Sequence, residues 1–360
     1  MNKKSLVKPS GRSLHLYSRR PLGPELGAPE PLHHPLKGSQ HLRWHALREE
    51  WVVYASNRQN RTFLPPKEYS PLAVTTDESF PTELPAGDYD VAVFENLFPS
   101  MTDEADESPE LFTSTRPAKG SCEVIVFSQD PQTSLGELAL DHLELILQVW
   151  AERTTEIGAR ENIQYVMPFE NRGVEVGVTL HHPHGQIYAY PFLPPVVGQF
   201  HKSQNDYLHK QGRRLLEDFV QDELRDRSRV IFENDGALSV IPVWARYPYE
   251  TWVLPKRSVP WLSDLTPSEI TDLAQALKVT LQKFDQLWKR PFPYICILYQ
   301  APMKTEGSRA WHTHFQFYPP YRSRDRLKFL AGTEIGAGLF VNDTWPEERA
   351  AELRDVRVDL

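Results

Sequence analysis

The stretch HHPHGQIYAY, residues 181–190, holds three histidines within four positions, followed by a glycine and a glutamine. Side chains alternate between the two faces of a strand, so His182, His184 and Gln186 are predicted to point the same way. Neutral imidazole is a competent nucleophile near neutral pH and attacks phosphorus. Gly185 would let a phosphate approach the backbone, and the Gln186 amide can donate a hydrogen bond to a phosphoryl oxygen. These residue types and spacings favour nucleophilic attack on a phosphate.

Two other interpretations of this stretch stay open on the residues alone. A polar outer face of an edge strand is favoured by Pro183, which cannot donate a hydrogen bond to a neighbouring strand. The H-x-H pair could also hold zinc, but two ligands are too few, and no cysteine or cluster of acids stands nearby.

Two segments of the chain repeat the same order of patterns. Each begins with a capping-box sequence, at Ser134–Glu137 and at Thr266–Glu269, and continues with apolar residues at helical spacing. The pattern H-x-H-x-Q-apolar-Y then stands at 182–188 and again 130 residues later, at 312–318. This agreement predicts an internal duplication. Strands are expected at 43–56, 90–94, 122–128, 163–169, 250–255, 294–299 and 311–318.

Charge, cysteine content and hydropathy exclude several classes of protein. The formal net charge of −8 argues against bulk nucleic-acid binding. The two cysteines, Cys122 and Cys296, form no C-x-x-C pattern, which fits a reducing compartment. No run of the chain resembles a signal-peptide core or a membrane span. We therefore expect a soluble cytoplasmic protein. Residues 1–40, which are rich in Pro, Gly, Ser and His without periodicity, are expected to form a mobile extension.

A series of motifs carries a resemblance to a known family. They are FEN (169–171), HPHGQ (182–186), SNRQNR (56–61), WARYPYETWVLPK (244–256), HTHFQFYPP (312–320) and RSRDRLKF (322–329). From about Arg43 to the C-terminus the chain resembles the galactose-1-phosphate uridylyltransferases, the transferase branch of the histidine-triad superfamily. The resemblance implies an α+β fold of two tandem histidine-triad-like repeats, each an antiparallel sheet with a packed helix, joined into one half-barrel-type sheet. Residues 41–195 would form the N-terminal repeat with the nucleophile. Residues 196–360 would form the C-terminal repeat with a substrate-binding C-terminal segment.

The resemblance also implies a mechanism of two displacements. His184 would attack the α-phosphorus of UDP-glucose, glucose 1-phosphate would leave, and galactose 1-phosphate would then take the uridylyl group from the histidine. Gln186 cannot protonate a leaving group, so we expect it to hold the phosphoryl oxygens and to favour transfer over hydrolysis. In the family, the segment with Lys328, Phe329 and Glu334 reaches the site from the partner subunit of a homodimer. The implied substrate-binding residues are Arg58, Arg61, Asn96, Asn171, Thr179, Lys328, Phe329 and Glu334.

The sequence departs from the family at two metal sites. Members bind zinc through a C-x-x-C pair and two histidines, but here the corresponding segment has no cysteine, and Pro131 stands at one histidine position. Only His182 remains of that site, and only His314 remains of a second metal site in the C-terminal repeat. We therefore expect no zinc, iron or other cofactor, with both histidines as remnants. At the other ligand positions of the second site stand Phe200, Tyr299 and Gln316.

Two alternative functions remain beside the uridylyltransferase. One is a phosphorylase of nucleoside-diphosphate sugars, for example ADP-glucose, or of dinucleotides. The other is a non-catalytic nucleotide-binding histidine-triad protein, against which the intact His184-Gly185-Gln186 core argues.

Overall fold

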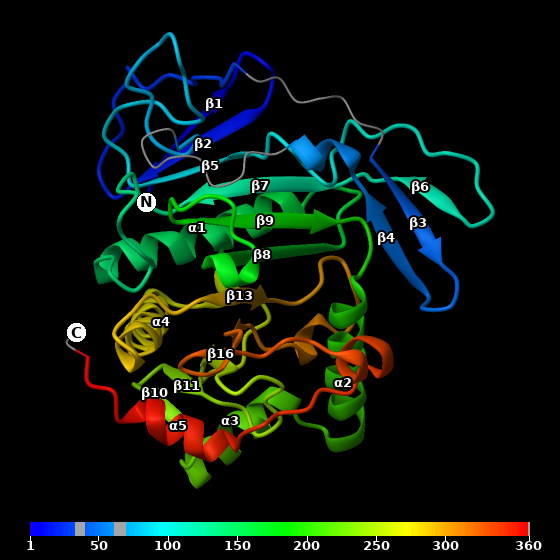
Figure 1. The fold of residues 1–360 in the computed structure, drawn as a ribbon, viewed down its shortest axis with the longest axis vertical. Helices are drawn as coiled ribbons and strands as arrows, with labels where there is room; N and C mark the ends of the chain where they lie inside the picture. The colour runs from blue at the N-terminus through cyan, green and yellow to red at the C-terminus, as the bar shows by residue number, and fades with distance from the viewer. Residues whose placement is uncertain (33–39, 61–69, 359–360) are drawn as a thin grey trace.

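A computed structural model describes residues 1–32, 40–60 and 70–358. One sheet of 11 strands, in which every neighbouring pair is antiparallel, runs through the whole molecule (Figure 1). In spatial order its strands are β1 (Asn2–Val7), β2 (Ser13–Ser18), β5 (Val91–Glu95), β7 (Ser121–Val126), β9 (His184–Tyr190), β8 (Tyr165–Arg172), β13 (Tyr294–Tyr299), β14 (His314–Tyr318), β12 (Thr251–Pro255), β11 (Ala237–Val240) and β10 (Val230–Glu233).

Two long helices cover one face of this sheet and pack against each other: α1 (Leu140–Gly158) and α4 (Pro267–Leu287). Their apolar faces and the inward residues of both halves of the sheet form the main core, which includes Leu147, Trp150, Leu281 and Phe284. The short helix α5 (Pro346–Arg354) contributes Ala350 and Leu353 to the same core. The expected combination of an antiparallel sheet with packed helices is therefore present.

The opposite face of the sheet is covered by separate elements. The N-terminal strands and residues around 72–89 form one apolar cluster there. A three-stranded sheet of β4 (Glu50–Tyr54), β3 (His41–His45) and β6 (Thr115–Pro117) forms a second cluster. Helix α2 (Pro195–Gln211) contributes Val197 and Phe200 to a third cluster, and α3 (Leu215–Asp226) packs over β10, β11 and β12 in a fourth. The hairpin of β15 (Tyr321–Ser323) and β16 (Arg326–Leu327) follows β14 (Figure 1).

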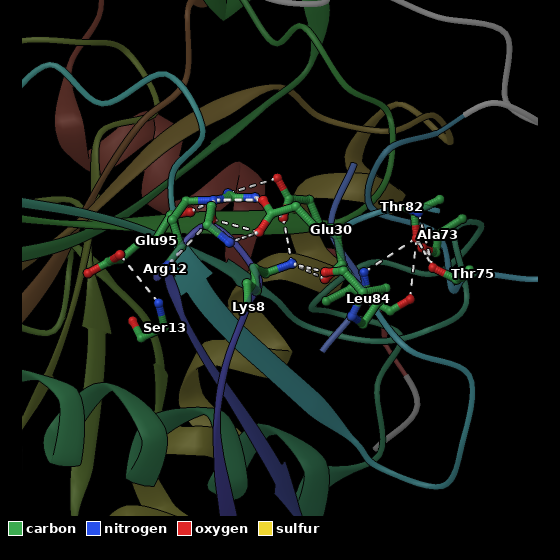
Figure 2. A network of polar contacts seen from close by, with 12 residues as sticks. Lys8, Arg12, Ser13, Glu30, Ala73, Thr75, Thr82, Leu84 and Glu95 are labelled. Carbon is green, nitrogen blue, oxygen red and sulfur yellow. Dashed lines mark hydrogen bonds and ion pairs between the residues drawn. The ribbon is translucent and has the colours of Figure 1, made fainter. Parts of the chain in front are cut away.

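The expectation of a mobile extension over residues 1–40 is wrong for residues 1–32, and 33–39 lie outside the described residues. Strands β1 and β2 join the main sheet, with Leu14 and Leu16 fully buried. The buried Lys8 ammonium donates to the carbonyl oxygens of Pro29 and Glu83 at 2.7 Å each. Figure 2 shows this lysine and Arg12 within one polar network. Composition did not predict that this segment is structured, because buried ion pairs rather than a long apolar run stabilise it.

The two predicted capping boxes have different outcomes. At α4 the prediction is confirmed, because the Thr266 amide donates to the Glu269 carboxylate at 2.8 Å and the Thr266 hydroxyl accepts from the Glu269 amide. At α1 it is wrong, since that helix begins at Leu140 without a side-chain cap. Ser134 and Glu137 instead close a separate turn, in which the Glu137 amide donates to the Ser134 carbonyl at 3.0 Å.

Candidate active site

The candidate site lies on the sheet face opposite to α1, at the start of β9. This strand is internal, paired with β7 on one side and β8 on the other, so the edge-strand interpretation is wrong. His184 and Gln186 are half-buried, whereas the alternating residues Ile187 and Ala189 are fully buried in the core against the helices. Alternation along the strand thus leaves the two polar side chains on the face away from the helices.

The register of the sheet brings Asn171 to the same place. Phe169 of β8 lies opposite Gln186 of β9, and extending this antiparallel register by two residues places Asn171 opposite His184. Directly opposed residues in such a pair point to the same face. The FEN and HPHGQ motifs are therefore one site, formed by two neighbouring strands. The intervening Glu170 points to the other face and is buried beside the Tyr294 hydroxyl, which donates to it at 2.8 Å.

The His184 ring is held in one orientation by a main-chain carbonyl. Its Nδ1–H donates to the carbonyl oxygen of His182 at 2.7 Å. This fixes the proton on Nδ1 and leaves the lone pair on Nε2, for which the described residues provide no partner. Burial lowers the pKa of His184, with the hydrogen bond to the His182 carbonyl acting in the opposite direction. The ring is therefore neutral, and nucleophilic at Nε2, at neutral pH.

Three candidate polar side chains remain available to a ligand in the described part of the chain. No hydrogen bond there engages the side-chain amides of Gln186 and Asn171 or the hydroxyl of Thr179, and all three side chains are half-buried. The two amides lie on the same face as the His184 ring, where their N–H groups can donate to an anionic, oxygen-rich ligand.

Gly185 serves the packing behind the strand. A Cβ at this position would lie 2.8 Å from the Phe127 ring and 2.8 Å from the Phe169 carbonyl oxygen. Gly185 was expected to make room for a phosphate. In the structure, the absence of its side chain instead permits close packing on the opposite, buried face.

His182 does not line the site with His184, contrary to the sequence prediction. Strand β9 begins only at His184, and the His182 side chain is buried, with its Nε2–H donating to the Ser128 carbonyl at 2.7 Å. This bond ties the loop before β9 to the segment after β7. The role of the His182 carbonyl in orienting the nucleophile was not predicted, because every residue has a main-chain carbonyl and the sequence does not show which one accepts a given bond.

The histidines at the family's two metal positions differ in how their ring nitrogens are used. His182 uses Nε2 to donate to the Ser128 carbonyl and leaves Nδ1 buried without a partner, and no group of three or more His, Cys, Asp or Glu side chains gathers within the described ranges. At the second position, the His314 Nδ1–H donates to the His312 carbonyl at 2.8 Å and its Nε2 accepts from the Gln316 amide at 2.8 Å. Both nitrogens of His314 are therefore occupied.

Arg58 and Asn96 lie at the other end of β9, near Tyr188. Arg58, in a 3-10 turn at 56–60, donates to the Phe98 carbonyl at 3.0 Å and to the Tyr188 hydroxyl at 3.2 Å. The Asn96 side-chain oxygen accepts from the Phe98 amide at 2.9 Å. Tyr188, which sequence reasoning missed, shares the face of His184 and Gln186 by period-two alternation. Arg61 falls outside the described residues.

The three C-terminal candidates form no hydrogen bond or ion pair with His184 in the described part of the chain. Lys328 and Glu334 are buried and form an ion pair at 3.5 Å, and Glu334 also accepts from the Ala331 amide at 3.1 Å. Phe329 is 78% exposed. Among the described residues, no hydrogen bond or ion pair joins this segment to the strands of the site. Shortly before this segment, the Tyr321 hydroxyl donates at 3.0 Å to Glu175 in the loop that precedes Thr179.

Comparison with known proteins gives a consistent result over most of the chain. Profiles for the N-terminal and C-terminal domains of galactose-1-phosphate uridyl transferase match residues 33–194 and 200–359. The galactose-1-phosphate uridylyltransferase of Thermotoga maritima is 35% identical over 325 residues, 89% of this chain and 99% of that protein. The enzyme of the same name from Haemophilus influenzae is 34% identical, covering 90% of this chain and 95% of that protein.

Solved structures agree. A structure described as a uridylyltransferase superposes with a TM-score of 0.79 at 32% identity, covering 88% of this chain and 98% of that one. An ADP-glucose phosphorylase from Arabidopsis thaliana shares the fold, with a TM-score of 0.67 at 24% identity over 88% of this chain and 99% of that one.

Proposed function

The chain belongs to the galactose-1-phosphate uridylyltransferase family, nucleotidyltransferases that act between UDP-glucose and a hexose 1-phosphate, and from this we propose that His184 is its nucleophile. The supporting observation is the free, oriented Nε2 of His184. The Nδ1–H bond to the His182 carbonyl points the lone pair away from the strand backbone, and burial keeps the ring neutral until it reacts.

In the first displacement, Nε2 attacks the α-phosphorus of UDP-glucose. The bond from this phosphorus to the bridging oxygen breaks, its electron pair leaves with glucose 1-phosphate, and a uridylyl-histidine remains. The ring retains its Nδ1 proton and becomes cationic, a charge that the His182 carbonyl stabilises. In the second displacement, a phosphate oxygen of galactose 1-phosphate attacks the same phosphorus, and the electron pair of the N–P bond returns to Nε2.

Gln186 and Asn171 are proposed to hold the phosphoryl oxygens. Their amides flank Nε2 from adjacent strands and have no partner in the described chain, so they can donate without first breaking a bond. Neither amide can deliver a proton to a leaving group, which favours a covalent intermediate that waits for a sugar phosphate. Thr179, in the loop before β9, adds a hydroxyl to this group.

The remaining predicted residues are proposed to bind the rest of the substrates. Asn96 would serve the uridine, and Arg58 and Arg61 the phosphates. Lys328, Phe329 and Glu334 would serve the sugar phosphate across a homodimer interface, since their segment forms no hydrogen bond or ion pair with His184 in the described part of the chain. A second copy would also cover the exposed apolar side chains of this segment: Phe329, Leu330, Ile335, Leu339, Val341 and Trp345.

Three broader features belong to the same proposal. The strand order β8, β9, β7, β5 on one side of the sheet mirrors β13, β14, β12, β11 on the other, which supports two tandem repeats. The occupied ring nitrogens of His314, and the small number of ligands that remain around His182 in the described residues, support a site that works without zinc or iron. Both cysteines are free and buried, which supports a cytoplasmic location.

No helix in the described part of the chain is long and apolar enough to cross a membrane.

Intact mass spectrometry tests the proposed function. Incubation with UDP-glucose alone should add one uridylyl group per chain, and galactose 1-phosphate should then remove it. An adduct with ADP-glucose but not UDP-glucose would instead support a phosphorylase. No adduct with either nucleotide sugar would support a binding protein that has lost catalysis.

A further inference from the structure

A buried arginine of the N-terminal segment, residues 1–32, holds the main chain beside a candidate site residue. This segment precedes the part of the chain that the N-terminal domain profile matches, 33–194, so the family resemblance assigns it no role. Arg12 lies in the turn between β1 and β2, within the polar network that Figure 2 shows. Its Nη1 donates to the carbonyl oxygen of Glu95 at 2.9 Å, and the next residue along the chain is Asn96.

The peptide group between Glu95 and Asn96 is held at both ends. On one side its N–H, from Asn96, donates to the Cys122 carbonyl of β7 at 2.8 Å. On the other side its carbonyl oxygen accepts the bond from Arg12, just past the last pair of β2 and β5, which joins Leu14 to Phe94. The arginine side chain thus takes over the carbonyl at which the pairing of the two strands stops.

The Arg12 guanidinium is itself fixed by two carboxylates. Nη1 and Nη2 donate to the two oxygens of Glu83 at 3.0 Å each, and Nε donates to Glu30 at 3.1 Å. Lys8 balances the charge, because its ammonium forms a 2.8 Å ion pair with Glu83. Buried charges are stable when each is paired and hydrogen-bonded, and bidentate arginine contacts also fix direction. The network therefore sets the position of the Glu95 carbonyl closely.

Asn96 presents its side-chain amide in one orientation. The side-chain oxygen accepts from the Phe98 amide at 2.9 Å, and no hydrogen bond engages the NH₂ group within the described ranges. This half-buried NH₂ group can donate to a ligand, and the carbonyl oxygens of a pyrimidine base are acceptors of the matching kind. Because the side chain starts from the peptide that Arg12 holds, a shift of that peptide would move the donor.

We propose that Arg12 is a positioning residue for Asn96, and that the N-terminal segment thereby contributes to binding of the nucleotide substrate. Arg12 acts through the peptide group between Glu95 and Asn96. The inference rests on the proposed function only in assigning Asn96 to the uridine. Loss of the Arg12 bond should therefore weaken binding of a uridine nucleotide beyond what the loss of a buried ion pair alone would cause.

Calorimetric titration of the full chain with UMP tests the inference. Arg12→Met should weaken UMP binding about tenfold, the effect of losing roughly one hydrogen bond to the ligand. Lys8→Met is the matched control, because Lys8 is also buried and also pairs with Glu83 but forms no bond to Glu95. Both variants should lower the thermal midpoint, and Lys8→Met should bind UMP as tightly as wild type.

A double-mutant cycle separates positioning from a general loss of structure. Asn96→Ala should weaken UMP binding about as much as Arg12→Met. Adding Arg12→Met to Asn96→Ala should weaken it no further, because Arg12 acts only through Asn96. Additive losses would overturn the inference. If Arg12→Met does not fold, Arg12→Lys takes its place in the cycle, since it keeps a charge opposite Glu83 without the fork that also reaches Glu95.

The outcomes separate this inference from the proposed function. Equal UMP affinity of Arg12→Met and Lys8→Met would show that the network serves stability alone. Absence of UMP binding to wild-type protein would also overturn the inference, because Asn96 would then hold no nucleotide. UMP binding that depends on Arg12, in a protein that forms no uridylyl adduct, would support the inference and contradict only the proposed function.

Discussion

The β9 and β14 strands carry the same H-x-H-x-Q pattern in opposite environments. In each, the second histidine donates Nδ1–H to the carbonyl two residues earlier, at 2.7 Å for His184 and 2.8 Å for His314. His184 is half-buried, and among the described residues neither its Nε2 nor the neighbouring Gln186 amide has a hydrogen-bond partner. His314 is 2% exposed, and the rings of Trp252 and Tyr299 stack on it at 4.9 and 5.6 Å.

The difference shows that the motif alone does not make a nucleophile. On β14, the Gln316 amide donates to the very nitrogen that would attack, and the Tyr318 hydroxyl in turn donates to Gln316. On β9, the amide of Gln186 has no such bond and can serve a ligand. The same residues thus stabilise the fold in one strand and remain available for chemistry in the other.

The largest expected effect separates the two glutamines. Gln186→Ala should slow uridylyl-adduct formation about 10²–10³-fold, the usual effect of removing one donor to a developing oxyanion. Gln316→Ala should leave this rate within a factor of two or so of wild type and lower stability instead, because it leaves His314 unpaired. Single-turnover kinetics with UDP-glucose measure both. Equal rates for Gln186→Ala and Gln316→Ala would show that Gln186 has no catalytic role that Gln316 lacks.

Removing the histidines should have the larger effect on stability in β14: His314→Ala should lose more unfolding free energy than His184→Ala. His314→Ala should cost about 4 kcal/mol of unfolding free energy, since it opens a cavity between two stacked rings and leaves Gln316 and the His312 carbonyl unsatisfied. His184→Ala should cost about 1 kcal/mol, the value of one hydrogen bond. Urea denaturation of both variants provides the measurement. A larger loss in His184→Ala would show that β9 also serves mainly for stability.

Acid should affect the two histidines differently. Burial lowers the pKa of His314 to about 4, so the unfolded chain binds more protons than the folded one between about pH 4 and 6.5. Stability should therefore fall as pH decreases through this window, by on the order of 3 kcal/mol from His314. His314→Gln should show a smaller fall in urea titrations at pH 4.5 and 7.5. An identical fall would mean that His314 is already charged in the folded protein.

The pKa of His184 is also lowered by burial, and this predicts the pH dependence of the reaction. Adduct formation should be constant from pH 8 down to about 6.5, because the ring remains neutral over this range. It should decrease only at more acidic pH, where protonation of Nε2 removes the nucleophilic lone pair. A decline that begins above pH 7 would contradict the lowered pKa.

Metal removal should have the smallest effect on either strand. Because both ring nitrogens of His314 bond to protein groups and no cluster of ligands surrounds His182 in the described residues, dialysis against a chelator should leave the thermal midpoint and the rate of adduct formation unchanged. Elemental analysis of the same samples supplies the control. Loss of stoichiometric zinc together with a lower midpoint would show that ligands outside the described residues complete a site.

Sequence patterns predicted the strands and the central pair of residues because alternation along β9 is a local property. The expected strands at 90–94, 163–169 and 294–299 overlap β5, β8 and β13, and His184 and Gln186 share a face as predicted. The sequence did not predict that residues 2–18 are structured, because their structure depends on contacts of Lys8 and Arg12 with Glu83, about 70 residues away. The side chain of His182 was misplaced because the strand begins only at His184.

The central claim is that only the β9 histidine accepts the uridylyl group. Peptide mapping of wild-type protein after incubation with UDP-glucose tests it directly. The account predicts the adduct on the peptide that contains His184, no adduct on the peptide that contains His314, and no adduct in His184→Gly protein that retains wild-type secondary structure. A uridylyl group on the His314 peptide, or retained labelling of folded His184→Gly, would contradict it.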